Sequence, residues 1–227
     1  MIDAGNSTPS PEDLSVTERP RRRAPSHSRE AQLLDAACAV FADAGFLAAT
    51  MEAIAARARS TKPTLYAHFG SKEDLYRHCS ERAAENLARQ LFAAQVAAGG
   101  LSLEQQVRAG TLAFFDYAAA HPHEFRLLFG SEASGTVPAA RQRLMTAATD
   151  RIADLIREFA AAHDQPPWGA SATLCASFIV GLTVEGARSA LGAGPLSPRL
   201  AAEFATSFTV AALRHIDLSL AAAVDAG

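Results

Sequence analysis

Three features are scarce in this chain of 227 residues, and each scarcity argues against a class of protein. The cysteines number three, Cys38, Cys79 and Cys175, and such widely spaced thiols in apolar surroundings suit a reduced core better than disulfides or a zinc site. Uninterrupted apolar runs stay well short of the roughly 20 residues that cross a bilayer. Residues 1 to 28 do not join a basic segment to an apolar one, as a secretion signal would. We therefore expect a soluble, cytoplasmic protein without a membrane partner or a metal.

Aromatic residues make up only 7% of the chain, and β-branched residues rarely alternate with polar ones, so a β-sheet is not expected. Alanine recurs throughout, which favours helices because alanine loses the least free energy on entering one. Glycine and proline divide the chain into about nine helical segments. We predict an all-α protein in which an N-terminal three-helix head precedes a C-terminal helical bundle.

Charge is distributed unevenly, although the net charge is only −3. Residues 17–82 hold 11 basic and 8 acidic residues, whereas residues 83–227 hold 10 basic and 13 acidic ones. This difference is compatible with a head that meets phosphates. Residues 1–27 are rich in proline, serine and charge, and we expect a disordered arm there. Its basic run at residues 19–23 fits either a solvated tail or a segment that follows DNA.

Two short helices joined by a brief turn are predicted between residues 50 and 70. Thr50 is a natural N-cap for the first, and Thr61 for the second, where Pro63 falls in the first turn and its missing N–H is harmless. Ser71 then caps a long following helix. This arrangement is typical of a helix-turn-helix, whose second helix enters the major groove.

The second of these helices has one apolar side and one side suited to a groove. At about 100° per residue, Leu65 and Phe69 define the buried side, and Pro63 and Ala67 point away from it. The flanking positions carry a hydroxyl, a phenol and an imidazole, which can reach the phosphate walls. These flanking residues are Thr64, Tyr66 and His68.

The sequences TMEAIA at 50–55 and TLYAHFGSKEDL at 64–75 resemble the TetR/AcrR family of repressors. The resemblance implies that the second helix and the starts of its neighbours contact DNA, with Thr50 and Lys72 on phosphates. The full implied set is Thr50, Thr61, Lys62, Pro63, Thr64, Tyr66, His68 and Lys72. Two alternatives stay open, since Tyr66 also fits a surface aromatic and His68 also fits packing against Tyr76. Two positions depart from the common family pattern. Arg59-Ser60 replaces the Gly-Val common in the family's turn, so a left-handed turn residue and a small core hydrophobe are missing. Pro63 stands where the family often has glycine and some members have proline.

For the body, the resemblance implies a ligand cavity between the middle helices and a homodimer through the last two long helices. Independently, predicted helices at 170–191 and 198–220 are apolar around much of their circumference and need a partner surface. Plausible interface residues are Phe178, Leu182, Phe204, Phe208 and Leu213. Candidate pocket residues, which suit a core equally well, are Phe114, Tyr117, Phe125, Met145, Phe159, Trp168, Phe178 and Glu185.

Together these patterns predict an arm at 1–27, a helix-turn-helix domain at 28–75 and a sensing and dimerisation domain at 76–227. The predicted function is a ligand-responsive repressor that binds an inverted repeat in double-stranded DNA as a homodimer, in answer to an unknown small-molecule effector. Two alternatives remain: a helical interaction module without specific DNA binding, and an all-helical enzyme. The enzyme is disfavoured because no nucleophile–base pair, metal spacing or phosphate loop is apparent, and no cofactor is expected.

Overall fold

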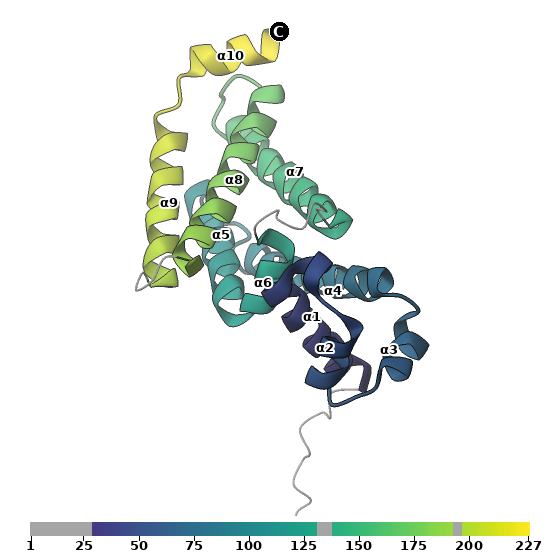
Figure 1. The fold of residues 1–227 in the computed structure, drawn as a ribbon. Coiled ribbons are helices and arrows are strands. Elements are labelled where there is room, and N and C mark those ends of the chain that lie inside the picture. The colour runs from purple at the N-terminus through teal and green to yellow at the C-terminus, as the bar shows by residue number, and fades with distance from the viewer. Residues whose placement is uncertain (1–28, 131–137, 193–196) are drawn as a thin grey trace, which may run out of the picture.

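The computed structural model describes residues 29–130, 138–192 and 197–227, and every regular element in these ranges is a helix (Figure 1). The helices run over Arg29–Ala48 (α1), Met51–Arg57 (α2), Lys62–Phe69 (α3), Lys72–Ala97 (α4), Leu103–Ala120 (α5), Pro122–Phe129 (α6), Ala139–Ala162 (α7), Ala170–Gly192 (α8), Pro198–Arg214 (α9) and Leu218–Ala226 (α10). The all-α prediction is therefore confirmed.

The C-terminal end of the described chain differs from the expectation of about nine helices. The segment predicted as one helix over 198–220 is two helices, because α9 ends at Arg214 and α10 begins at Leu218. The side chain of Asp217 accepts a hydrogen bond from the backbone N–H of Ser219 at 2.9 Å. A carboxylate so placed caps a new helix, and the helices on its two sides are sharply bent relative to one another.

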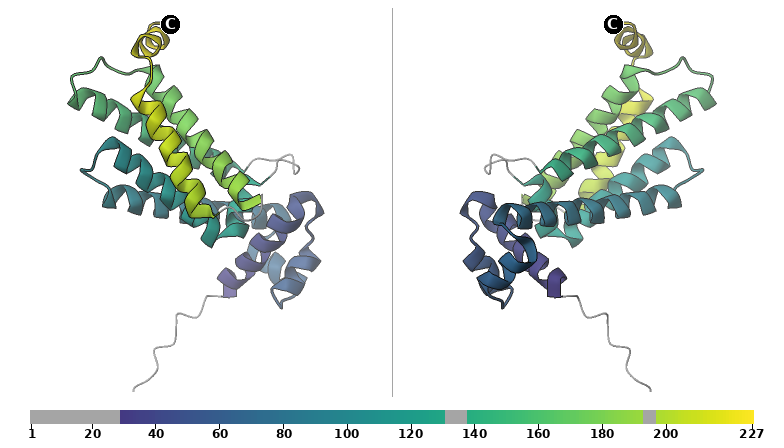
Figure 2. Two further views of the ribbon diagram at one scale, coloured as in Figure 1. Left: turned by 90° about the vertical axis from the view of Figure 1, so that its left-hand side faces the viewer. Right: turned by 90° about the vertical axis from the view of Figure 1, so that its right-hand side faces the viewer.

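Helices α1 to α3 form a head at one end of the molecule, and α4 leads from this head into the body (Figures 1 and 2). The head is closed by buried side chains from each of its helices, including Leu33, Ile54 and Leu65, which are fully buried. Leu75 and Leu87, both on α4, belong to the same core cluster. One continuous core thus extends from the head into the body.

In the body, α7 and α8 pack on each other, as do α5 and α9, and α8 also contacts α9 (Figure 2). By length and mean hydropathy, α1 and α8 are apolar enough to cross a membrane, although neither contains a long uninterrupted apolar run. In the structure α1 packs against α4 and α6, and α8 packs against α7 and α9. Their apolar surface is therefore used, at least in part, within the protein.

The predicted helix starts of the head are confirmed. The hydroxyl of Thr50 accepts from the N–H of Ala53 at 3.1 Å, and that of Thr61 accepts from the N–H of Thr64 at 3.3 Å. At α4, the Ser71 hydroxyl accepts from the backbone of Asp74 at 3.0 Å and donates to its carboxylate at 2.7 Å. These caps satisfy donors that a helix start leaves free, and they fix where α2, α3 and α4 begin.

Two thiols lie in the junction between α1 and α4, where both are buried. Burial raises the pKa of the Cys38 thiol to about 12, and burial likewise raises the pKa of Cys79. Because the thiolate is the reactive form, both side chains behave as small core residues.

The turn between α2 and α3 forms despite the departure from glycine. Arg59 adopts φ 47°, which is the left-handed conformation that glycine provides more easily. Its carbonyl accepts a hydrogen bond from the Arg29 guanidinium at 3.2 Å, and the N–H of Ser60 donates to Ala55 at 2.9 Å. The Ser60 hydroxyl, at the position where the family often has valine, is buried without a hydrogen-bond partner in the described structure.

We predict that Arg59→Gly stabilises the protein by about 1 kcal/mol, because it relieves the left-handed strain of a residue with a Cβ. Arg59→Ala is the matched control, since it also removes the guanidinium but keeps the Cβ. Urea unfolding measures both variants. If alanine stabilises as much as glycine, the strain is not the cause.

Candidate nucleic-acid interface

Helix α3 is anchored by one side and exposes the other. Leu65 is fully buried and Phe69 nearly so, whereas Lys62, Pro63 and Ala67 are exposed. The structure thus has the buried and exposed sides that the periodicity indicated. An exposed face with a proline and an alanine at its centre allows close approach to a groove.

The residues that flank this face are also accessible. Tyr66 is 46% exposed and His68 is exposed, while Thr64 is partly buried. The rings that pack on Tyr76 are Phe41 and Phe46, with centroids 5.1 and 5.0 Å away, and the ring contact of His68 is with its neighbour Phe69. The alternative in which His68 packs against Tyr76 therefore finds no support in these ring contacts.

Lys62, the first residue of α3, forms an ion pair with Glu52 of α2. The hydrogen bond from Lys62 holds the pKa of the Glu52 carboxyl below its usual range, and the same bond raises the pKa of Lys62. The sequence analysis missed this pairing. Opposite charges in the first turns of adjacent helices are the signal that would have indicated it.

Lys72 lies at the start of α4, and its ammonium is oriented by the end of α1. The Nζ atom is 3.4 Å from the carbonyl oxygen of Leu47 and 4.7 Å from the centre of the Phe46 ring. This contact combines a hydrogen bond with a cation–π interaction. Thr50, the other implied phosphate contact, is exposed at the N-terminus of α2, where free N–H groups favour anions. The basic run at residues 19–23 lies outside the described residues.

A cavity of about 320 Å³ lies in the body between α4, α5, α7 and α8. Its lining is mainly apolar and includes Leu87, Phe114, Met145 and Ile179, and Arg151 is the one charged side chain among the described residues that line it. The cavity therefore suits an apolar molecule of modest size.

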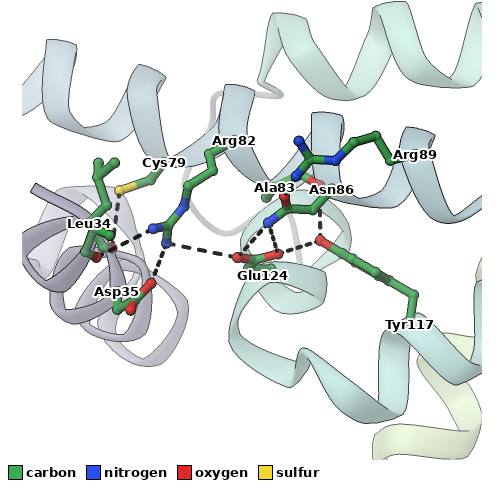
Figure 3. A network of polar contacts seen from close by, with 10 residues as sticks. Leu34, Asp35, Cys79, Arg82, Ala83, Asn86, Arg89, Tyr117 and Glu124 are labelled. Carbon is green, nitrogen blue, oxygen red and sulfur yellow. Dashed lines mark hydrogen bonds and ion pairs between the residues drawn. The ribbon is translucent and has the colours of Figure 1, made fainter. Parts of the chain in front are cut away.

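Of the eight side chains proposed for the pocket, the structure brings Phe114 and Met145 to this cavity. Phe125 packs on Phe114 from the side of α6, with ring centroids 5.8 Å apart. The Tyr117 hydroxyl donates to Glu124 in a polar network at the junction of head and body (Figure 3).

The remaining four proposed residues, like Phe125 and Tyr117, lie outside the lining of this cavity. Phe159 stacks on His163 with centroids 4.0 Å apart, and Trp168 packs on a second cluster between α7 and α8. Phe178 is 66% exposed, and Glu185 forms an exposed ion pair with Arg188 on the same helix.

Large apolar side chains are exposed along α8 and α9 of the single chain. The most exposed are Phe204 at 75% and Phe178 at 66%, and Phe208 is exposed as well. Leu182 and Leu213, also proposed for the interface, are partly buried against clusters within the chain. A surface of this kind is unusual on a monomeric soluble protein.

Comparison with known proteins agrees with this geometry. A model of the family described as bacterial regulatory proteins, tetR family, matches residues 33–79. The HTH-type transcriptional activator FasR of Mycolicibacterium smegmatis is 34% identical over 200 residues, which are 87% of this chain and 88% of that protein. The HTH-type transcriptional repressor SCO4008 of Streptomyces coelicolor is 34% identical over 100 residues, 44% of this chain and 47% of that one.

Solved structures share the fold. A TetR-like transcriptional regulator from Rhodococcus sp. RHA1 superimposes with a TM-score of 0.70 at 29% identity, covering 86% of this chain and 100% of the other. The ketosteroid transcriptional regulator KstR2 of Mycobacterium tuberculosis superimposes with a TM-score of 0.65 at 19% identity, covering 82% of this chain and 95% of the other. The molecule is a helix-turn-helix DNA-binding transcriptional regulator. It belongs to the TetR family.

We predict that Lys72→Met weakens binding to operator and to random duplex DNA alike, and lowers the slope of log affinity against log salt by about 1 for each bound subunit. Fluorescence anisotropy over a salt series measures both effects. Arg143→Met, which removes an exposed positive charge from α7, controls for net charge. An unchanged slope in Lys72→Met would show that this ammonium does not reach a phosphate.

Proposed function

We propose that this regulator is a repressor whose operator affinity falls when a small apolar effector occupies the cavity of the body. The observation that carries this proposal is the extent of α4. Its first residue, Lys72, lies beside α3, and Leu87 and Leu91 further along the same helix line the cavity. A molecule that shifts the cavity wall therefore acts on the element that supports the DNA-contacting head.

We further propose a homodimer through α8 and α9. The exposed phenylalanines on these helices supply the apolar area that a stable interface needs. A two-fold axis would place the two α3 helices about one DNA turn, or a multiple of it, apart, and the operator would be an inverted repeat. The expected partners are thus double-stranded DNA, a second copy and an effector, all in the cytoplasm.

Repression is the simplest regulatory effect, because occupying an operator blocks transcription without a further partner surface. The relatives differ in this respect, since FasR is named an activator and SCO4008 a repressor. In vitro transcription from a promoter that contains the operator decides between the two. Lower output with added protein supports repression, and higher output overturns it.

We infer that the effector is bound and released unchanged. The cavity lining is mainly apolar, and the Thr183 hydroxyl at its wall is already bonded to the carbonyl of Ile179 at 2.8 Å. Such a lining offers shape and apolar contact rather than acid–base chemistry. Incubation of a stabilising compound with the protein, followed by mass spectrometry, tests for turnover.

Gly110 lines the cavity, and the space where its Cβ would lie is open, so a large side chain at this position would extend into the cavity. A thermal-shift screen of apolar and aromatic compounds identifies ligands of the wild type. We expect Gly110→Leu to fold. It should lose most of the ligand-induced rise in melting temperature and most of the ligand-induced release from DNA. Gly110→Ala, which gives a similar gain in helix propensity without filling the space, should keep both. Equal ligand shifts in the leucine variant would place the effector elsewhere.

The variant Phe204→Glu would bury a charge in the proposed dimer interface. We expect a monomer in analytical ultracentrifugation and at least about a tenfold loss of operator affinity, because one head would bind without the other. Leu101→Glu is the control, since Leu101 is exposed but lies between α4 and α5. A dimeric Phe204→Glu protein would rule out this face.

A further inference from the structure

The guanidinium of Arg82 bridges the head and the body, beside a more exposed ion pair between Arg126 of α6 and Asp43 of α1. On α4, Arg82 places Nη2 2.8 Å from the Asp35 carboxylate of α1 and 3.8 Å from the Glu124 carboxylate of α6 (Figure 3). Its Nη1 lies 3.4 Å from the carbonyl of Ala31, also on α1. The side chain is 23% exposed, so water screens these contacts only in part. One side chain therefore connects three helices.

The body side of this bridge is held firmly. The Asn86 amide donates to both oxygens of Glu124, at 3.2 and 3.1 Å, and the Tyr117 hydroxyl donates to one of them at 2.6 Å (Figure 3). The Glu124 side chain is only 14% exposed. Burial, together with the hydrogen bond to Glu124, raises the pKa of Tyr117, so the phenol stays a donor. Glu124 is thus a fixed point to which α1 is tied through Arg82.

Small side chains make up part of the apolar contact at this junction. Beside Leu33, Leu34 and Phe41, α1 buries three alanines, Ala36, Ala37 and Ala39. Alanines give shallow ridges, and helices that meet through them interlock less than helices that meet through large side chains. A planar guanidinium between two carboxylates has a defined direction, which apolar contact lacks.

The bridge is not optimised for stability. Arg82 Nε is buried without a hydrogen-bond partner in the described structure, which costs desolvation energy. An ion pair of this kind adds little net stability after desolvation, and its value lies in geometry. The head side is the more accessible one, since the Asp35 side chain is 60% exposed.

We propose that Arg82 is a positioning residue that fixes the angle between head and body, and thereby the spacing of the two half-sites that the protein accepts. The inference rests on the proposed homodimer and inverted repeat. In a dimer, the bodies are joined and each head is set by its own junction. A looser junction lets the heads reach half-sites that are further apart or rotated.

The test uses the full-length protein and an operator selected from a random duplex library. Each inserted base pair moves the half-sites apart by about 3.4 Å and rotates them by roughly 35°. Fluorescence anisotropy gives the affinity for the operator, for versions with one or two base pairs inserted at the centre, and for a single half-site. Wild type, Arg82→Met and Asp35→Asn are compared. Arg77→Met is the control, because Arg77 pairs with Asp74 and Glu81, which lie on α4 itself.

We expect the operator affinity of wild type and of Arg77→Met to fall about tenfold or more when base pairs are inserted. The operator affinity of Arg82→Met should fall about threefold or less, and its affinity for a single half-site should be unchanged. Asp35→Asn should relax the spacing in the same direction. A wild type indifferent to spacing would contradict the proposed dimer and operator. Wild-type spacing preference in Arg82→Met would overturn the inference itself. If Arg82→Met fails to fold by circular dichroism, Asp35→Asn decides, since its side chain is largely in water.

Discussion

The structure depends on one stiff element, the helix α4, which the head and the body share. It begins at the Ser71 cap beside α3 and continues for 26 residues, about 39 Å, into the bundle. Leu75 is buried in the part of the core that lies in the head, and Leu87 is buried in the part that lies in the body. Because a helix transmits rotation and tilt along its length, neither half can rearrange without involving the other. In the proposed function, binding of DNA and occupancy of the cavity would therefore be connected by covalent geometry as well as by side-chain contacts.

The turn of the helix-turn-helix contains two residues that cost folding free energy, and the surrounding structure tolerates them. Arg59 takes a left-handed conformation, and Ser60 leaves a hydroxyl unbonded in the described structure, so both residues are less favourable than a glycine and a valine would be. The caps at Thr50 and Thr61 and the bond from Arg29 to the Arg59 carbonyl hold the turn in place. The fold survives because its surroundings determine the turn more strongly than the turn residues do.

The head was predictable from the sequence because its signals are local. A cap at Thr50 or Ser71 satisfies N–H groups three residues away, and the buried side of α3 follows from helical geometry alone. The cavity was not predictable in the same way. Phe114 and Phe125 are similar side chains in adjacent helices, yet Phe114 faces the cavity and Phe125 the core behind it. That difference depends on how α5 and α6 are placed against their neighbours, which periodicity does not report.

The ion pair between Glu52 and Lys62 would affect the choice of DNA site if Lys62 contacts DNA as predicted. The cation at the entry of α3 already has a partner within the protein, so a DNA site gains from Lys62 only if it offers something better than Glu52. On random duplex DNA the Lys62 ammonium would exchange a carboxylate for a phosphate, and the two interactions have similar free energies. A correctly placed guanine offers two acceptors to the ammonium. The carboxylate thus lowers what Lys62 would add at every site by about the free energy of the ion pair, and only a site with a better acceptor would draw the ammonium away from Glu52.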